Sequence, residues 1–102
     1  MTLSKHVKTL LVIVAEAALE KNLVRDARER GAQNWTISEV HGAAREGVRE
    51  GHWEADRTIE LKLICDAAVA DAMAEHVIAT YAKNYAVALY FSEVGVLRPE
   101  RY

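Results

Sequence analysis

The segment RTIELKLIC, residues 57–65, decides the fold of this 102-residue chain. Its residues alternate strictly between an apolar set and a more polar set. The apolar set is Ile59, Leu61, Leu63 and Cys65, and the second set is Thr58, Glu60, Lys62 and Ile64. Successive side chains of a β-strand point to opposite faces, so the alternation predicts a strand with one buried face. The other elements are assigned outward from this strand.

Three further segments have the composition of strands. Residues 7–15 (VKTLLVIVA) and 85–91 (YAVALYF) are apolar on both alternating sets, which is typical of strands covered on both faces. Residues 34–40 (NWTISEV) alternate Trp35 and Ile37 with Thr36 and Ser38, which predicts a strand with one polar face. Residues 94–97 prolong the apolar character of the last segment.

Two segments have a helical repeat. In residues 16–30 the charged residues, Asp26 among them, are assigned to a solvent-facing side, and Gly31 suits a left-handed residue after the last turn. The apolar stripe of this helix is Leu19, Leu23 and Ala27. Asp66 is a candidate N-cap for a second helix that extends to about residue 82. The stripe of the second helix is Val69, Met73, Val77 and Tyr81.

The order strand, helix, strand, strand, helix, strand predicts a ferredoxin-like α+β fold in a single domain, with two helices on one face of a four-stranded antiparallel sheet. Right-handed crossovers then bring the first and third strands to the middle. The first and last strands carry apolar side chains on the face without helices as well. These are Leu10, Val12 and Val14, and Ala86, Ala88 and Tyr90. We expect other copies of the chain to cover that face.

Composition and charge exclude several classes of function. The formal net charge is −2, from 13 basic and 15 acidic residues, so nothing favours binding to nucleic acid. No segment is long and apolar enough for a membrane span, and no signal peptide precedes the first charged helix. The single cysteine suits a reducing compartment, so we expect a cytoplasmic protein. The histidines lack metal-ligand spacing and the serines lie in no nucleophile elbow, which disfavours a metal site and an enzyme.

A glycine-containing connection, HGAAREGVREGHWEADR (residues 41–57), separates two of the predicted strands. Its Gly42 allows backbone N–H groups to turn inward, while Arg45 and Arg49 offer planar forks suited to phosphate or carboxylate. Arg98 and Arg101 form a second basic pair near the end of the chain. The alternative is a solvated loop whose acidic residues neutralise its arginines, and the spacing alone does not decide between the two.

Residues 35–45 (WTISEVHGAAR) resemble the strand that leads into the T-loop of PII signalling proteins, where Thr-x-Ser-Glu-Val is followed by a glycine and an arginine. The following IELKLIC and its helix fit the same family, and the order of elements agrees over nearly the whole chain. The resemblance implies a homotrimer of ferredoxin-like subunits that is not an enzyme. It also implies adenine nucleotides bound in clefts between neighbouring subunits. The T-loop, here about residues 42–56, would contact a target protein.

Two departures from classical PII proteins narrow this expectation. The loop contains no tyrosine, so the tyrosine that some PII proteins uridylylate has no counterpart. Residues 83–88 (KNYAVA) stand where PII proteins have a phosphate loop with glycine and lysine, which favours a nucleotide with fewer phosphates than ATP. The short loop and the strand NYAVALYFSEV resemble PII-like proteins found with bicarbonate transporters and carboxysomes. That subgroup implies AMP, ADP or cyclic AMP as ligand, bicarbonate as a further ligand, and a role in inorganic-carbon acquisition at the carboxysome.

The resemblance also assigns nucleotide- and anion-binding residues position by position. Those at the strand and T-loop entry are Thr36, Ser38, Glu39, Gly42, Arg45 and, at a less fixed spacing, Arg49. The backbone of Ala86, Val87, Ala88 and Leu89 would face the adenine, and Arg98 and Arg101 would reach the phosphates, although a solvated tail is the alternative for this pair. A second family with this fold, the trimeric divalent-cation tolerance type, implies a metal or structural role and needs converging histidines.

Overall fold

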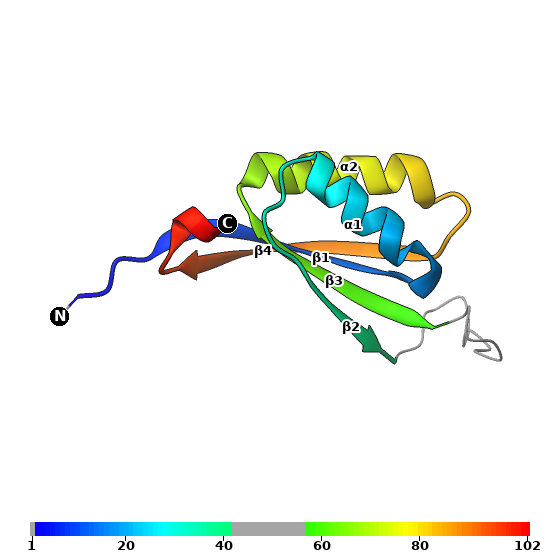
Figure 1. The fold of residues 1–102 in the computed structure, drawn as a ribbon, viewed down its shortest axis with the longest axis horizontal. Coiled ribbons are helices and arrows are strands. Elements are labelled where there is room, and N and C mark those ends of the chain that lie inside the picture. The colour runs from blue at the N-terminus through cyan, green and yellow to red at the C-terminus, as the bar shows by residue number, and fades with distance from the viewer. Residues whose placement is uncertain (1, 42–56) are drawn as a thin grey trace.

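The computed structural model describes residues 2–41 and 57–102. The helices and strands run β1 (His6–Glu16), α1 (Glu20–Glu29), β2 (Thr36–Val40), β3 (Thr58–Cys65), α2 (Ala67–Tyr81) and β4 (Val87–Val96), with short 3-10 helices at Ala17–Leu19 and Pro99–Arg101. The strands form one antiparallel sheet in the order β2-β3-β1-β4, and both helices lie on the same face of it (Figure 1). The predicted ferredoxin-like fold is confirmed, including the central position of the first and third strands.

The hydrophobic core fills the space between the sheet and the two helices. Leu61, Leu63 and Cys65 of β3 point into it, as their alternation predicts, and Ile59 is also buried. The core residues contributed by β1 and the helices are Leu11, Ile13, Ala15, Leu19, Leu23, Ala27, Ala70, Met73, Val77 and Tyr81. Burial raises the pKa of the Cys65 thiol, so this cysteine is a packing residue.

The first helix begins later than its sequence pattern predicts. Glu16 remains in the sheet, where it pairs with Thr58 of β3, and residues 17–19 form a 3-10 turn before α1 starts at Glu20. The end of α1 agrees with the prediction, because Gly31 adopts a φ of 100°. Around it the Ala32 N–H donates to the Ala27 carbonyl over 3.0 Å, which closes the last turn.

Two details of the second half also differ from the sequence prediction. Asp66 lies at the N-cap of α2 and its carbonyl accepts the Ala70 N–H, but its carboxylate makes no capping hydrogen bond. That carboxylate accepts instead from Lys8 Nζ at 2.6 Å. The last strand starts at Val87 rather than residue 85 and continues to Val96 without a break, because it pairs with β1 along that whole length.

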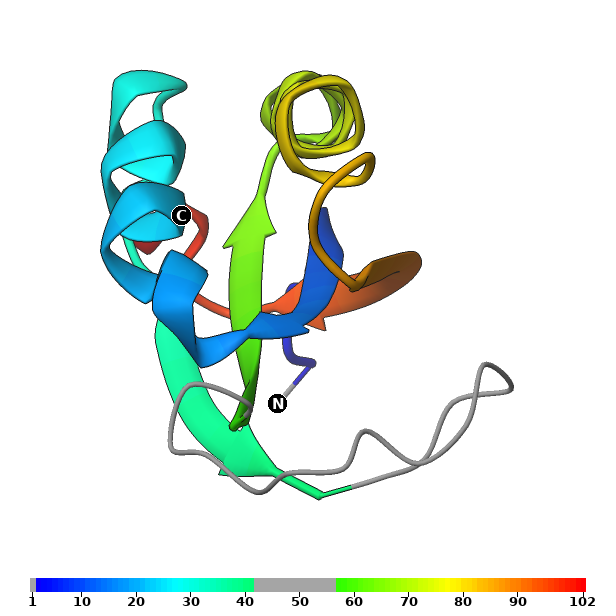
Figure 2. The same ribbon diagram turned by 90° about the vertical axis from the view of Figure 1, so that its right-hand side faces the viewer.

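The face of the sheet opposite the helices is the open face, and its central residues are apolar as predicted. It includes Leu10, Val12 and Val14 of β1 and, across the ladder, Ala88 and Tyr90 of β4. Val12 is buried between its sheet neighbours, whereas Tyr90 is 52% exposed. Figure 2 shows that the helix layer covers only the other side of the sheet.

Candidate functional site

Two groups of the residues assigned to nucleotide binding lie on the two edge strands of the sheet. Thr36, Ser38 and Glu39 are exposed on β2, and residues 86–89 lead into and begin β4. These two strands are separated by β3 and β1. Three inter-strand spacings amount to about 14 Å, so a single copy does not bring the two groups together.

The two edges present different groups. Thr36 and Ser38 pair across the ladder with Lys62 and Glu60, so they lie on the open face. On β4 the side chains of Val87 and Leu89 pack against the core. In the described part of the chain, the outer edge of β4 has no strand partner, and its backbone N–H and C=O groups are available for hydrogen bonds.

Polar contacts gather at the end of the sheet where β1 and β2 finish and β3 and β4 start (Figure 1). Arg57 Nη1 lies 2.5 Å from Glu39 Oε1 across the two strands, and the Arg57 carbonyl accepts the Ala17 N–H at 2.7 Å. Glu16 Oε2 accepts the Ala86 N–H at 2.8 Å. The sequence pattern missed this role of Glu16 because it assigned the residue to the first helix.

The C-terminal arginines lie at the other end of the molecule. Arg98 forms a 3.5 Å exposed ion pair with Glu100, and the Arg101 carbonyl accepts a hydrogen bond of 3.1 Å from the Asn34 side chain. A shallow depression here is lined by Gln33, Asn34, Arg98, Glu100, Arg101 and Tyr102. The ten residues of β4 span about 34 Å, so within one copy these arginines lie beside the start of β2 and far from the start of β4.

Three of the assigned residues, Gly42, Arg45 and Arg49, lie outside the described residues, as does the predicted T-loop of about residues 42–56. Their assignment stays a prediction from the sequence.

A second polar cluster, here called the Asp26 cluster, joins α1 to α2. Asp26 is only 2% exposed, and the prediction that it faces solvent is wrong. Its Oδ2 accepts from the Tyr81 hydroxyl at 2.5 Å and lies 2.9 Å from His76 Nε2. Its Oδ1 accepts from the Arg25 guanidinium at 3.1 Å, and Arg30 donates both to the Asp26 carbonyl and toward His76 Nδ1.

The hydrogen bonds fix the charge state of this cluster. Burial disfavours the charged form of Asp26, but donors from Tyr81, His76 and Arg25 outweigh it, so the pKa of Asp26 is lowered. Burial and the bond to Asp26 raise the pKa of Tyr81. An ionised carboxylate only accepts, so His76 Nε2 donates to it, and Nδ1 accepts from Arg30. This arrangement corresponds to the neutral Nε2–H tautomer.

Residues 8–101 match the family model "Nitrogen regulatory protein P-II". The chain belongs to this P-II family. Its members are regulatory proteins, in agreement with the resemblance seen in residues 35–45. No curated protein matches the sequence significantly.

Solved structures agree with the P-II assignment. The P-II chain is 34% identical to a PII-like signalling protein from Thermus thermophilus, over 98% of this chain and 99% of that one, with a TM-score of 0.83. It is 18% identical to CPII, a nitrogen regulatory PII-like protein from Thiomonas intermedia, over 98% of this chain and 97% of that one, with a TM-score of 0.86. That CPII structure holds ADP, AMP and bicarbonate. A DUF3240 family protein from Shewanella baltica is similar at a TM-score of 0.65, with 18% identity over 82% and 86% of the chains.

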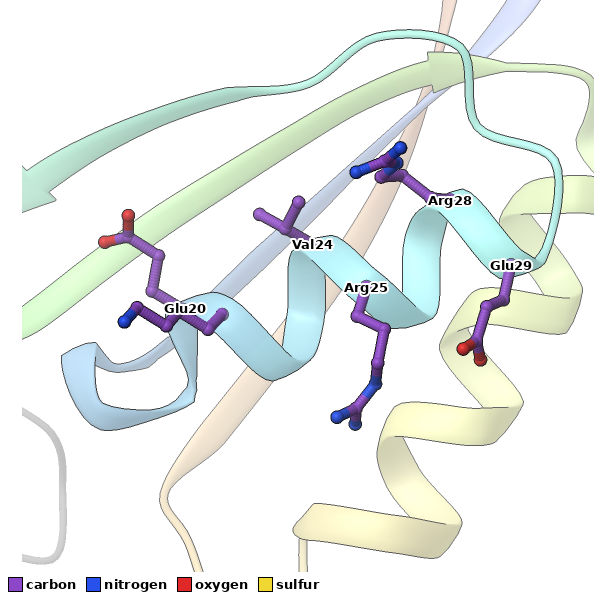
Figure 3. A pocket seen from close by; sticks show the side chains of 6 residues that line it. Glu20, Val24, Arg25, Arg28 and Glu29 are labelled. Carbon is purple, nitrogen blue, oxygen red and sulfur yellow. The ribbon is translucent and has the colours of Figure 1, made fainter.

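One further depression on the P-II chain runs along the outer surface of α1. Its lining comes from one helix: Glu20, Lys21, Val24, Arg25, Arg28 and Glu29. Figure 3 shows Arg25 and Glu29 projecting from one side of α1, and Glu20, Val24 and Arg28 from the other. Side chains of both charges on a single helix make an open charged surface, and among the described residues no second element encloses a ligand there.

Clusters of metal ligands and membrane-spanning helices are both absent from the described part of the P-II chain. Within residues 2–41 and 57–102, no three His, Cys, Asp or Glu side chains come together to hold a metal ion. In the same part of the chain, no helix is long and apolar enough to cross a membrane.

Proposed function

We propose that this chain is a non-enzymatic, homotrimeric PII-like sensor that binds AMP or ADP, with bicarbonate as a second ligand. In this proposal it regulates inorganic-carbon acquisition through a target protein that the T-loop contacts. Membership of the P-II family over residues 8–101 is the observation that carries the proposal. CPII, a structural neighbour, was solved with ADP, AMP and bicarbonate bound, which supports the choice of ligands.

The positions of the edge strands support a site shared between copies. Thr36, Ser38 and Glu39 lie on one edge of the sheet, and residues 86–89 lie on the other. A cleft in which the β2 edge of one copy meets the β4 edge of the next would unite the two groups. The C-terminal arginines, which lie beside the start of β2, would then belong to the β2 side of that cleft.

The open face supports assembly as well. Tyr90 is half exposed there, next to the apolar centre of the sheet formed by Leu10, Val12 and Val14. A ring of three copies would bury this surface and leave the helices outside. A Val12→Asp substitution would set a carboxylate in that apolar centre, and we expect it to abolish the trimer.

The direct test is calorimetric titration of the full chain with AMP, ADP, ATP, cyclic AMP and zinc, each with and without bicarbonate, together with sedimentation. We expect one molecule of AMP or ADP per chain and a trimer. Binding of zinc without nucleotide binding would favour the divalent-cation tolerance type of function. A stable monomer that binds neither AMP nor ADP would overturn the proposal.

The T-loop arginines sharpen this test. If Arg45 binds a phosphate, Arg45→Ala should lose about 1.5 to 3 kcal/mol of binding free energy, which is roughly a tenfold or greater loss of affinity. Arg45→Lys should recover only part of it, because lysine keeps the charge and loses the planar fork. Arg49→Ala is measured in parallel, and Arg28→Ala, an exposed arginine of α1, is the matched control. Equal affinities in all variants would remove the loop arginines from the site.

A further inference from the structure

The hydrogen bond between Glu16 and Ala86 lies where the pairing between β1 and β4 stops. The last paired residues are Ala15 and Val87, so the next positions along the two strands are Glu16 and Ala86. At these positions a side-chain hydrogen bond replaces the backbone pairing: Glu16 Oε2 accepts the Ala86 N–H at 2.8 Å. A side chain thereby extends the sheet by one hydrogen bond at the entry to residues 86–89.

The turn before β4 is held from its other side by α2. The N–H groups of Asn84 and Tyr85 both donate to the Tyr81 carbonyl, over 3.1 and 2.9 Å. Tyr81 is itself anchored by its hydroxyl to the buried Asp26. The short turn is therefore fixed at its beginning by a buried residue and at its end by the half-buried Glu16.

The chain beside Glu16 also contacts the strand that follows the T-loop. The Ala17 N–H donates to the Arg57 carbonyl over 2.7 Å, and the Arg57 guanidinium pairs with Glu39 of β2. Residues 16 and 17 therefore contact the entry of β4 on one side and the entry of β3 on the other. A displacement of Ala86 would move Glu16, and through the adjoining peptide it would move the contact with Arg57.

We propose that Glu16 is a positioning residue for the nucleotide site: it presets the backbone of residues 86–89 and links that segment to the base of the T-loop at Arg57. This rests on the proposed function, in which the backbone of residues 86–89 binds the adenine. A preset segment binds more tightly because less conformational entropy is lost on binding. Its link to Arg57 gives the nucleotide a route to the loop within the same copy, where a ligand acts through its different affinity for two conformations.

The test uses two substitutions of similar length. Glu16→Met keeps the aliphatic chain and removes the acceptor, while Glu16→Gln keeps a carbonyl acceptor and removes the charge. We expect Glu16→Met to weaken AMP and ADP binding about fivefold to tenfold, in the range expected for the loss of one ordinary intramolecular hydrogen bond. Glu16→Gln should recover most of the affinity. Glu75→Met, at an exposed position of α2, is the matched control, and Glu16→Ala replaces the Met variant if that variant does not fold.

Hydrogen exchange separates positioning from a general loss of structure. In Glu16→Met without ligand, the Ala86 amide should exchange faster while the melting temperature and core amides stay unchanged. Saturating nucleotide should slow exchange of the Ala17 amide, which reports on the bond to Arg57, in wild type and not in Glu16→Met. Equal slowing in both proteins would overturn the link to Arg57.

The binding outcomes distinguish this inference from the function on which it rests. A wild-type protein that binds neither AMP nor ADP overturns the proposed function, and the role of Glu16 falls with it. Wild-type binding with the same affinity in Glu16→Met overturns the role of Glu16 alone. A loss in Glu16→Gln equal to that in Glu16→Met would show that the charge matters and the hydrogen bond to Ala86 does not.

Discussion

The Asp26 cluster and the contacts at the end of the sheet are both polar, yet they differ in burial. Asp26 is 2% exposed and its carboxylate oxygens receive hydrogen bonds from Tyr81, His76 and Arg25. At the end of the sheet, the side chains of Glu39 and Arg57 are 60% and 54% exposed. Water is excluded from the Asp26 carboxylate, whereas it competes for the ion pair between Glu39 and Arg57.

This difference separates the cluster that stabilises the fold from the contacts beside the proposed site. Removing one member of a buried, satisfied cluster leaves its partners without water or protein to bond, which is costly. Contacts in solvent contribute little to folding because water replaces them readily. In the proposed function these contacts can therefore rearrange when a ligand binds, at low cost to the fold. This suits the end of the sheet that holds Glu39, Arg57 and the entry of β4. The Asp26 cluster instead fixes the position of α1 against α2.

Loss of the Asp26 charge should have the largest effect on stability. Asp26→Asn keeps the shape of the side chain but turns one acceptor into a donor, which faces either Tyr81 and His76 or Arg25. We expect the free energy of unfolding to fall by about 3 kcal/mol, measured by urea denaturation. Asp71→Asn, at an exposed position of α2, should stay within about 0.5 kcal/mol of wild type. An Asp26→Asn protein as stable as the control would show that the cluster contributes no net stability.

Acid should weaken the Asp26 cluster through the same carboxylate. The pKa of Asp26 is lowered in the folded protein from the ordinary value of 3.8, so its ionised form stabilises the fold above about pH 4. That contribution is lost as the pH falls through the lowered pKa. The difference in unfolding free energy between wild type and Asp26→Asn should therefore shrink between about pH 5 and the most acidic pH at which both fold. If this difference in unfolding free energy stays constant over that pH range, the pKa of Asp26 is not lowered in the folded protein.

The fold was predictable because the apolar pattern of each strand and helix lies within its own segment of sequence. The alternation of residues 57–65 and the four-residue repeat of Leu19, Leu23 and Ala27 each reflect a side chain's position within its own element. The β1 and β4 boundaries were less accurate, because the partner strand determines where pairing ends. Glu16 continues to pair with Thr58, and Ser92 and Glu93 remain in β4 despite their polarity.

The polar clusters were harder to predict, for a reason that Asp26 illustrates. It lies three residues after Leu23 and next to Ala27, so helical spacing alone could have put it beside the apolar stripe. Its burial depends on His76 and Tyr81, which are 50 and 55 residues away in the sequence. Likewise, nothing local to Glu16 indicates that its carboxylate meets the N–H of residue 86. Long-range pairing of this kind needs the three-dimensional structure.

The smallest expected effect on stability belongs to the exposed pair of Glu39 and Arg57. Glu39→Gln removes the charge of an ion pair in which both side chains are more than half exposed. We expect the free energy of unfolding to change by less than about 1 kcal/mol. At higher salt concentration this change should be smaller still, because salt screens the exposed ion pair. Combining Glu39→Gln with Asp26→Asn should give additive changes, because the two sites share no partner among residues 2–41 and 57–102. A loss from Glu39→Gln as large as that from Asp26→Asn would mean that exposure does not separate the two regions. A small loss of stability together with an altered affinity for AMP or ADP would support the proposed role of Glu39 in ligand binding.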